Sequence, residues 1–192
     1  MGSSRVDRLA SDLGEWEAPG ALAALRDEYL ALLTERGPGG LERSGGPEHI
    51  TASCFVLSPG LDRVLLCFHG KGRFWVQLGG HVEADDPSVA AAALREAGEE
   101  SGLDGLALLS DVPLDVDRHG LGDGFGRCSR HWDVGYGAIA DPALPLVVSD
   151  ESDDLAWWPV DALPAEVPPG FASRLAGAVE AARRLQALGT GR

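Results

Sequence analysis

Positive charge is scarce in this chain of 192 residues. Lysine occurs once, at Lys71, and lysine and arginine together number 16, against 30 aspartates and glutamates. The formal net charge is −14. Because nucleic acids and membrane surfaces are themselves anionic, this excess of acid argues against a nucleic-acid or membrane-surface binder. We therefore expect neither partner. An anionic small molecule stays compatible with the composition if divalent cations screen the charge at its site.

Cysteine is also rare. Cys54, Cys67 and Cys128 lie far apart, and no C-x-x-C pair occurs, which argues against a zinc knuckle or a thioredoxin-like motif. An odd number of cysteines without a signal peptide predicts free thiols in a reducing cytoplasm. We expect all three to be ordinary buried or half-buried side chains. No apolar run approaches the ~18 residues that would indicate a membrane span.

The chain begins with a helical pattern over residues 1–36. Apolar residues recur there at helical spacing, at Leu22, Leu25, Tyr29, Leu32 and Leu33. Glycine and proline interrupt the pattern at 37–40 and again at 44–47. We interpret 1–46 as an N-terminal helical extension that packs on the main domain or on a partner chain, where it is the expected contact of a possible homodimer.

Strand patterns follow the extension and alternate with two further helices. We expect strands at 49–57, 63–68, 74–78, 106–109, 112–119, 131–140 and 155–158. A helix is predicted from about Pro87 to Ser101, with Asp86 as N-cap, Pro87 in the first helical position and Gly102 as the stop. A closing helix is predicted over 175–188. The main domain is thus expected at 47–165, and 166–192 as a C-terminal helix packed on it.

The predicted helix at 87–101 carries the most informative residues. Positions three and four apart share a helix face, so Glu96 aligns with Glu99 and Glu100. Three carboxylates on one face repel one another unless a cation lies between them, and Mg²⁺ or Mn²⁺ prefers such oxygen ligands. A solvated acidic face would give the same pattern. The apolar stretch from Val89 to Leu94 favours a packed helix whose acids line a cleft.

The segment from Gly80 to Leu103 resembles the signature box of the Nudix hydrolases. That box is a glycine, five residues, a glutamate, seven residues, then Arg-Glu-apolar-any-Glu-Glu-any-Gly-apolar, and residues 95–103 match its second half fully. The resemblance covers about 48–165 and implies an α/β fold, an α/β/α sandwich with a mixed β-sheet, flanked here by N- and C-terminal helices. One residue too many separates Gly80 from Arg95. Either Asp85 or Asp86 replaces the first box glutamate, and Asp86 as a plain N-cap is a further alternative.

The resemblance also implies roles for individual residues. Glu99 and Glu100 would be the main ligands of Mg²⁺ or Mn²⁺, together with the carbonyl oxygen of Gly79. Glu96 would be a further metal ligand or the base that activates water, and Arg95 would orient it. The implied reaction is hydrolysis of the diphosphate bond in a nucleoside diphosphate linked to another group.

Two other functions compete with hydrolysis. The first is a non-catalytic Nudix-like domain that senses a nucleotide, which would have no need of the intact Arg95-Glu96 and Glu99-Glu100 pairs. The second is an isomerase of isoprenoid diphosphates, which shares the fold and would be expected to use a cysteine near the site. Neither Cys67 nor Cys128 lies in a setting typical of such a cysteine, so hydrolysis is favoured.

Polar residues outside the box are weaker candidates. Asp115, Asp117 and His119 alternate on one predicted strand and His131 and Asp133 on the next, so they share one face. We expect His119, His131 and Asp133 to border the substrate cleft; exposed strand polarity is the alternative.

Four more candidates lie at 71–75, before the box, and in the acidic run 150–154. Glu151 is the candidate for a metal ligand outside the box. Lys71 and Arg73 are candidates for phosphate contacts. Trp75 is expected to point into the core rather than to stack on a base.

Overall fold

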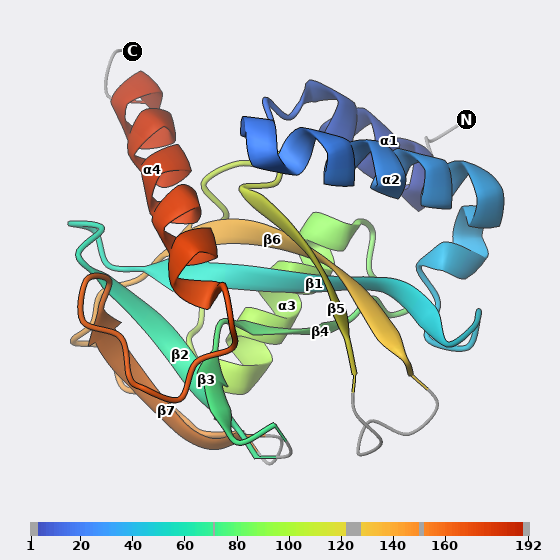
Figure 1. Ribbon diagram of the computed structural model, residues 1–192. Helices are drawn as coiled ribbons and strands as arrows, with labels where there is room; N and C mark the ends of the chain where they lie inside the picture. The colour runs from blue at the N-terminus through green and yellow to red at the C-terminus, as the bar shows by residue number, and fades with distance from the viewer. Residues whose placement is uncertain (1–3, 71, 122–127, 150–151, 190–192) are drawn as a thin grey trace.

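Helices cover both faces of one mixed β-sheet in the computed structural model of the chain (Figure 1). The structure describes residues 4–70, 72–121, 128–149 and 152–189. Its helices are α1 (Arg5–Glu15), α2 (Gly20–Arg36), a short 3-10 helix (Gly37–Gly40), α3 (Val89–Ser101) and α4 (Phe171–Gly189). Its strands are β1 (Glu48–Leu57), β2 (Arg63–His69), β3 (Phe74–Val76), β4 (Leu78–His81), β5 (Asp115–Gly120), β6 (Arg130–Ile139) and β7 (Ser152–Pro159).

Strand β1 organises the sheet, whose main order is β3-β2-β1-β6-β5. It pairs in parallel with β6 along its whole length, from Glu48 opposite Arg130 to Leu57 opposite Ile139. Its other edge is shared, since residues 51–54 pair with β4 and residues 56–57 with β2, both antiparallel. Strand β7 adds to β2. With both edges paired and both faces covered, β1 is buried from His49 to Leu57, and its last four residues, 54–57, are all apolar, as expected for a central strand.

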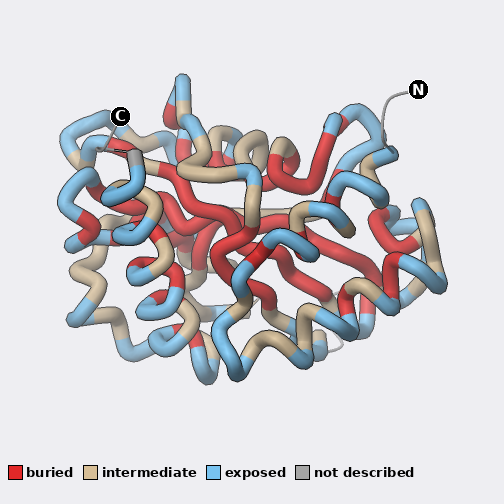
Figure 2. Tube along the Cα trace, turned by 90° about the horizontal axis from the view of Figure 1, so that it is seen from above, coloured by how far each residue is buried: buried red, intermediate tan, exposed pale blue. Residues whose placement is uncertain are grey.

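Two apolar cores lie on opposite faces of the sheet, which appears as the buried central layer in Figure 2. On one face, α3 packs through small side chains at Ala90, Ala93 and Ala97, and α1 and α2 join the same core. On the other face, Phe171, Leu175 and Val179 of α4 pack against β1 and β2. The expected α/β/α sandwich with a mixed sheet is therefore confirmed.

The N-terminal segment forms two helices rather than one, with a break between Trp16 and Pro19. Tyr29 of α2 is fully buried. Its hydroxyl donates a hydrogen bond shared by two backbone carbonyl oxygens, that of Asp117 at 2.7 Å and that of Asp133 at 2.8 Å. This contact attaches α2 to both β5 and β6. Because a buried hydroxyl needs such a partner, it also fixes where α2 lies on the sheet.

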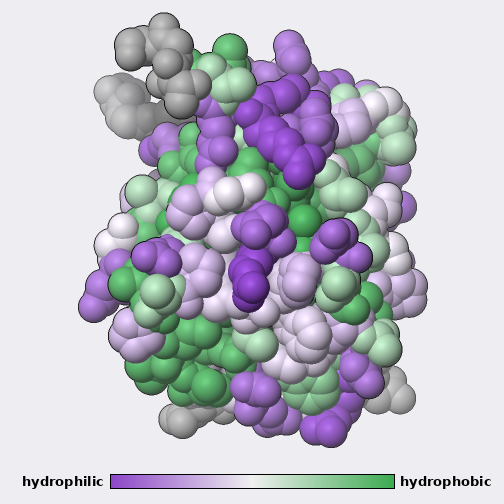
Figure 3. All heavy atoms as spheres, turned by 90° about the vertical axis from the view of Figure 1, so that its left-hand side faces the viewer, coloured by the Kyte–Doolittle hydropathy of each residue, from purple (hydrophilic) through white to green (hydrophobic). Residues whose placement is uncertain are grey.

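Large exposed apolar side chains are few in the described part of the chain: Leu144, Val147, Val148 and Leu188. None of these lies on α1 or α2. Figure 3, which views the left-hand side of Figure 1, shows hydrophilic and hydrophobic side chains interspersed over that face. Of the helices that the structure describes, none is both long and apolar enough to cross a membrane.

Three strand predictions differ from the structure, for identifiable reasons. The segment 106–109 forms only one isolated bridge, between Leu108 and Ala138. The predicted strand from 112 begins at Asp115 instead, because Pro113 has no N–H to donate to a ladder. The predicted strand 74–78 is divided at Gln77, and its second part, β4, continues through Gly79 and Gly80 to His81. That continuation places Gly79 and Gly80 inside the sheet.

Candidate active site

Helix α3 begins two residues later than the sequence indicates. Ser88, not Asp86, is the N-cap, and its hydroxyl accepts a hydrogen bond of 3.0 Å from the backbone N–H of Ala91. The first helical residue is Val89, so the assignment of Pro87 to the first position was wrong as well. At the other end Gly102 adopts φ 68°, a left-handed conformation suited to glycine, and stops the helix as predicted.

Asp86 is free of the capping role because Arg95 holds its carboxylate. Arg95 Nε donates to Oδ1 at 3.0 Å and Nη2 donates to Oδ2 at 2.9 Å, and the backbone N–H of Glu83 also donates to Oδ2. Burial opposes ionisation here, but these hydrogen bonds hold the pKa of Asp86 below its usual value. Of the two aspartates considered for the first box position, Asp86 is therefore the one bound to the box arginine.

Arg95 forms hydrogen bonds with four residues in and around the box. Besides Asp86, its Nη1 donates to Glu96 and to Glu99, each at 2.9 Å, and its Nη2 donates to the carbonyl oxygen of His81 at 3.0 Å. The forked guanidinium makes five hydrogen bonds to four groups here, whereas a lysine has three donors and no fixed fork. The strong hydrogen bond with Asp86 raises the pKa of Arg95 above its already high value. Arg95 thus fixes α3 to the end of β4.

Glu96 and Glu100, one helical turn apart on α3, face the two glycines of β4. The carboxylate of Glu96 lies over Gly80 so closely that a Cβ there would be 2.5 Å from Oε2. Glu100 is 9% exposed, and its Oε2 accepts the N–H of Gly79 at 2.8 Å. Glu99 differs, since its side chain is 61% exposed and held by Arg95. The structure therefore brings Glu96 and Glu100 against the sheet and leaves Glu99 at the solvent edge.

These carboxylates supply the oxygen donors that a hard divalent cation takes. Among the described ion pairs, Arg95 is the only cation that pairs with any of these three glutamates, and it pairs with Glu96 and Glu99. The excess of negative charge beside Gly79 and Gly80 fits a cation site. Glu151, the predicted ligand outside the box, lies outside the described residues. Ser152, the next residue, donates its hydroxyl to Glu100 at 3.4 Å.

A second polar group lies on the face of the sheet covered by α4. Asp117 pairs with Asp133 and His119 with His131 across β5 and β6. Arg174 of α4 enters this group and pairs with Asp115 at 2.7 Å, Asp117 at 3.2 Å and Asp133 at 3.4 Å. The alternating polar residues therefore surround a buried guanidinium.

The aspartates of this group differ in their environment. Asp115 is 2% exposed, and burial raises its pKa to about 6 although Arg174 opposes the shift. Burial also acts on Asp117, but His119 and Arg174 together hold its pKa below the usual value. Asp133 is 5% exposed, and its oxygens accept hydrogen bonds from Thr51, Ser53, Gln77 and Arg174.

The sequence pattern did not reveal Arg174, Ser53 or Gln77 as members of this group. Their partners are distant in sequence, and no spacing rule connects them. Ser53 pairs in register with Gly79 of β4, so the Asp133 network adjoins the glycines that Glu96 and Glu100 face. The two polar groups therefore meet at the junction of β1 and β4.

The phosphate candidates lie farther along the sheet, at the turn after β2. Arg73 has a largely exposed side chain, which pairs with Asp153 at 3.3 Å and lies 5.0 Å from the ring centre of Phe68. Lys71 lies outside the described residues. Trp75 is half-buried and packs edge-on against Trp158, with ring centres 5.5 Å apart. Its contacts are those of a core side chain with one accessible edge.

His131 also belongs to a cluster that the sequence analysis did not identify, with His49, His81 and Cys128. Burial lowers the pKa of His81 to about 4 and that of His131 to about 3. Burial lowers the pKa of His49 too, against a contact with the Gly46 backbone. These imidazoles are therefore uncharged at neutral pH. The expectation that Cys128 is an ordinary thiol takes no account of these neighbours.

Comparison with known proteins agrees with the box geometry. The model of the NUDIX domain family matches residues 47–181. A NUDIX-family hydrolase from Clostridium perfringens is 27% identical, with a TM-score of 0.54 over 71% of this chain and 97% of that one. The dihydroneopterin triphosphate pyrophosphohydrolase of E. coli shares the fold at 17% identity, with a TM-score of 0.58 over 69% of this chain and 95% of that one.

A C. elegans Ap4A hydrolase also shares the fold, at 18% identity and a TM-score of 0.54, over 74% of this chain and 98% of that one. No curated protein matches the chain. The family match nevertheless spans well over half of the sequence, and it contains Arg95 and every residue to which Arg95 donates a hydrogen bond. On this evidence the chain belongs to the NUDIX domain family.

Proposed function

We propose that this protein hydrolyses the diphosphate bond of a nucleoside diphosphate linked to another group, with Mg²⁺ or Mn²⁺ as cofactor. One observation carries the proposal: Glu96 and Glu100 lie against Gly80 and Gly79, Glu100 bound by the N–H of Gly79 and Glu96 by an arginine that Asp86 also binds. A domain that only binds a nucleotide does not need this arrangement. The similar proteins from E. coli and C. elegans are named as hydrolases of dihydroneopterin triphosphate and of Ap4A.

The proposed roles follow from the position of each side chain. Glu99 and Glu100, with the carbonyl oxygen of Gly79, would hold the cation, which neutralises the charge that develops on the phosphate oxygens. Glu96 is the nearest carboxylate to Gly80 and would bind a further cation or accept the proton of the attacking water. Arg95 orients Glu96 through its 2.9 Å charge-assisted hydrogen bond.

The substrate contacts are proposed from exposure. His119 and Arg73 have accessible side chains, and they lie at opposite edges of the sheet, His119 on β5 and Arg73 directly before β3. Asp133, in contrast, is buried and already has four protein partners, so its role is to hold β1, β6 and α4 together around any substrate. This assignment places substrate selection on the accessible His119 and Arg73 rather than on the buried aspartates.

The test is a panel of nucleoside diphosphate derivatives with Mg²⁺ or Mn²⁺, scored for phosphate released after phosphatase treatment. Glu100→Gln should reduce kcat by at least about 100-fold, because the amide keeps the size but loses the charge that binds a hard cation. Glu99→Gln should also reduce it, and activity should disappear in EDTA and return with Mg²⁺.

The matched control is Glu180→Gln, an exposed glutamate of α4 that pairs only with Arg183 and Arg184 among the described ion pairs. It should behave as the wild type. Nucleotide binding without turnover on the whole panel would instead identify a sensing domain. Full activity of Glu100→Gln, or activity that excess EDTA does not reduce, would refute the proposed mechanism.

A further inference from the structure

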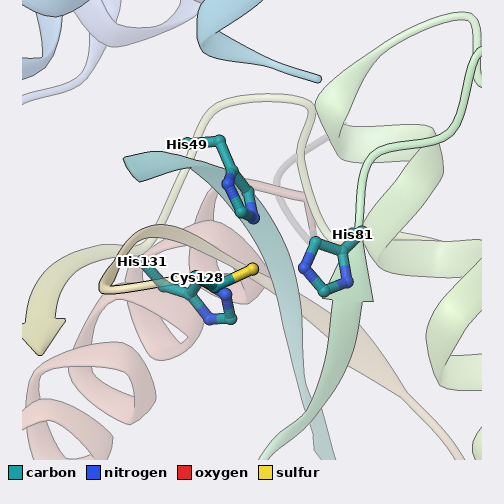
Figure 4. A group of neighbouring side chains, drawn as sticks. All are labelled: His49, His81, Cys128 and His131. Carbon is teal, nitrogen blue, oxygen red and sulfur yellow. The ribbon is translucent and has the colours of Figure 1, made fainter. Parts of the chain in front are cut away.

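Three histidines and one cysteine from three separate segments converge at one end of the sheet (Figure 4). His49 lies in β1, His81 ends β4, His131 lies in β6, and Cys128 lies just before β6. One possible ligand atom of each side chain lies within 4.8 Å of those of the other three. Figure 4 shows the four side chains directed into the space between them. The sheet itself makes this arrangement, since His49 is the register partner of His131.

The imidazole rings of this cluster contact one another almost symmetrically. Ring centres are 5.0 Å apart for His49 and His81, 5.1 Å for His49 and His131, and 5.3 Å for His81 and His131. The rings are tilted or perpendicular to each other rather than stacked. This geometry leaves ring nitrogens facing a common centre, which a stack of parallel rings would not do.

Several of these nitrogens are buried without a hydrogen-bond partner among the described residues. They are both ring nitrogens of His49 and Nε2 of His81 and of His131. Buried polar atoms of folded proteins almost always have a partner, because an unpaired one loses the hydrogen bonds it had with water. Three separate rings with unpaired nitrogens around one point indicate that something at this point accepts their lone pairs.

The donor set identifies the kind of occupant. Neutral imidazoles and a thiolate are the ligands of zinc and similar transition ions, whereas Mg²⁺ and Ca²⁺ take oxygen ligands. Tetrahedral zinc, with bonds of 2.0–2.3 Å, places its ligand atoms about 3.3–3.8 Å apart, so the described side chains need to move inward by only about 1 Å. We propose that His49, His81, Cys128 and His131 form a four-coordinate site for a zinc ion, separate from the glutamate site of the box.

Four protein ligands leave no open position, so the proposed role is structural. The ion would join β1, β4, β6 and the segment that leads into β6. His81 is also the residue whose carbonyl oxygen accepts a hydrogen bond from Arg95. Zinc at this site therefore holds the end of β4 from one side while the box arginine holds it from the other, and both act on the strand that carries Gly79 and Gly80.

A route for the ion exists beside the cluster. Cys128 lines a cavity of about 990 Å³ together with Glu42, Arg43 and Glu83. His49 is fully buried, whereas Cys128, at 9% exposed, and the half-buried His81 and His131 lie nearer the solvent. Arg5 also lines the cavity, so its two glutamates offset the charges of two arginines. A cation that enters this cavity would reach the Cys128 thiol in its wall.

The test uses the full chain, purified with an affinity tag that contains no histidine. We expect about one zinc ion per chain by elemental analysis, retained through dialysis. Cobalt substituted into the wild type should give the strong visible absorption of tetrahedral Co²⁺ and a thiolate-to-metal charge-transfer band. Cys128→Ser should remove that band and weaken zinc binding by at least about 100-fold, because the loss of a direct ligand exceeds the 10- to 100-fold effect of an outer-shell partner.

The control is His69→Asn, a change of a β2 histidine outside the cluster, which should leave zinc content and the cobalt spectrum unchanged. Removing zinc should lower the Tm of the wild type and not that of Cys128→Ser. The proposal is overturned if wild-type protein supplied with zinc and then dialysed stays substoichiometric, which would leave water as the partner of these nitrogens. It is also overturned if folded Cys128→Ser keeps wild-type zinc affinity. Neither result depends on hydrolase activity, so the box mechanism is tested separately.

Discussion

Replacing Arg174 by methionine removes the guanidinium from the buried aspartates and keeps a long apolar side chain in its place. Arg174 is the only partner that the described ion pairs give to Asp115 and Asp133, which are 2% and 5% exposed. Breaking a buried ion pair by removing one partner costs about 3–5 kcal/mol, because the remaining charge is left uncompensated. We expect Arg174→Met to lower the free energy of unfolding by about this amount at pH 8.

The loss should depend on pH, with a sign fixed by Asp115. The pKa of Asp115 is raised to about 6 in the folded state, from an ordinary value of 3.8. The folded protein therefore keeps this proton to a higher pH than the unfolded chain does. Stability is present at low pH and falls as the pH rises through the folded pKa, by about 3 kcal/mol for a shift of this size. Without Arg174, which opposes the shift, the pKa should rise further.

Urea unfolding followed by circular dichroism at pH 5, 6, 7 and 8 measures this difference. The gap between wild type and Arg174→Met should be small at pH 5, where Asp115 binds a proton, and largest at pH 8. The double variant Arg174→Met/Asp115→Asn should recover part of the stability at pH 8, since one buried charge is then absent. A gap below about 1 kcal/mol at pH 8, or an equal gap at pH 5, would refute this account of the network.

The remaining predictions concern the box. Gly80→Ala should fold with nearly wild-type Tm yet lose most activity, because the new Cβ meets only the flexible end of Glu96, at 2.5 Å, and displaces it. Gly79→Ala should instead lower the Tm strongly, since its Cβ would lie 2.5 Å from the backbone oxygen of Ala52. A Gly79→Ala variant with the Tm of the wild type would contradict the close approach of β1 and β4. Arg95→Lys should lower kcat with little change in cation affinity, because lysine keeps the charge and loses the fork. Wild-type turnover of Arg95→Lys would show that Arg95 only balances charge.

Local patterns predicted the box helix well, and its start poorly. Apolar periodicity and Gly102 define the body and the end of α3 without any tertiary information. The start was misplaced because Asp86 and Ser88 are both good N-cap residues, and the choice between them depends on Arg95, nine residues from Asp86. N-cap preference depends only on residue type, so it does not reveal that the Asp86 carboxylate is already bound by Arg95.

Groups assembled by the sheet were harder to predict than groups on one element. His49 and His131 are neighbours only because β1 and β6 are parallel, a pairing that requires a crossover and leaves no short sequence spacing to recognise. The same holds for Arg174, whose partners lie 41 and 59 residues away. The alternation of Asp115, Asp117 and His119 did predict a shared face. It did not predict that a cation from α4 would occupy that face.

The parallel pairing of β1 with β6 also has a consequence for how the chain is made. Glu48 and Arg130 are partners across 82 residues of sequence, and all ten residues of β1 wait for this partner. During synthesis, β1 with its apolar C-terminal half therefore leaves the ribosome long before β6 exists, and β2 and β4 can cover only its opposite edge. Long-range parallel pairing is slow and exposes strand edges while it is incomplete. The nascent chain is thus most vulnerable to aggregation, and most dependent on chaperones, until residue 139 has emerged.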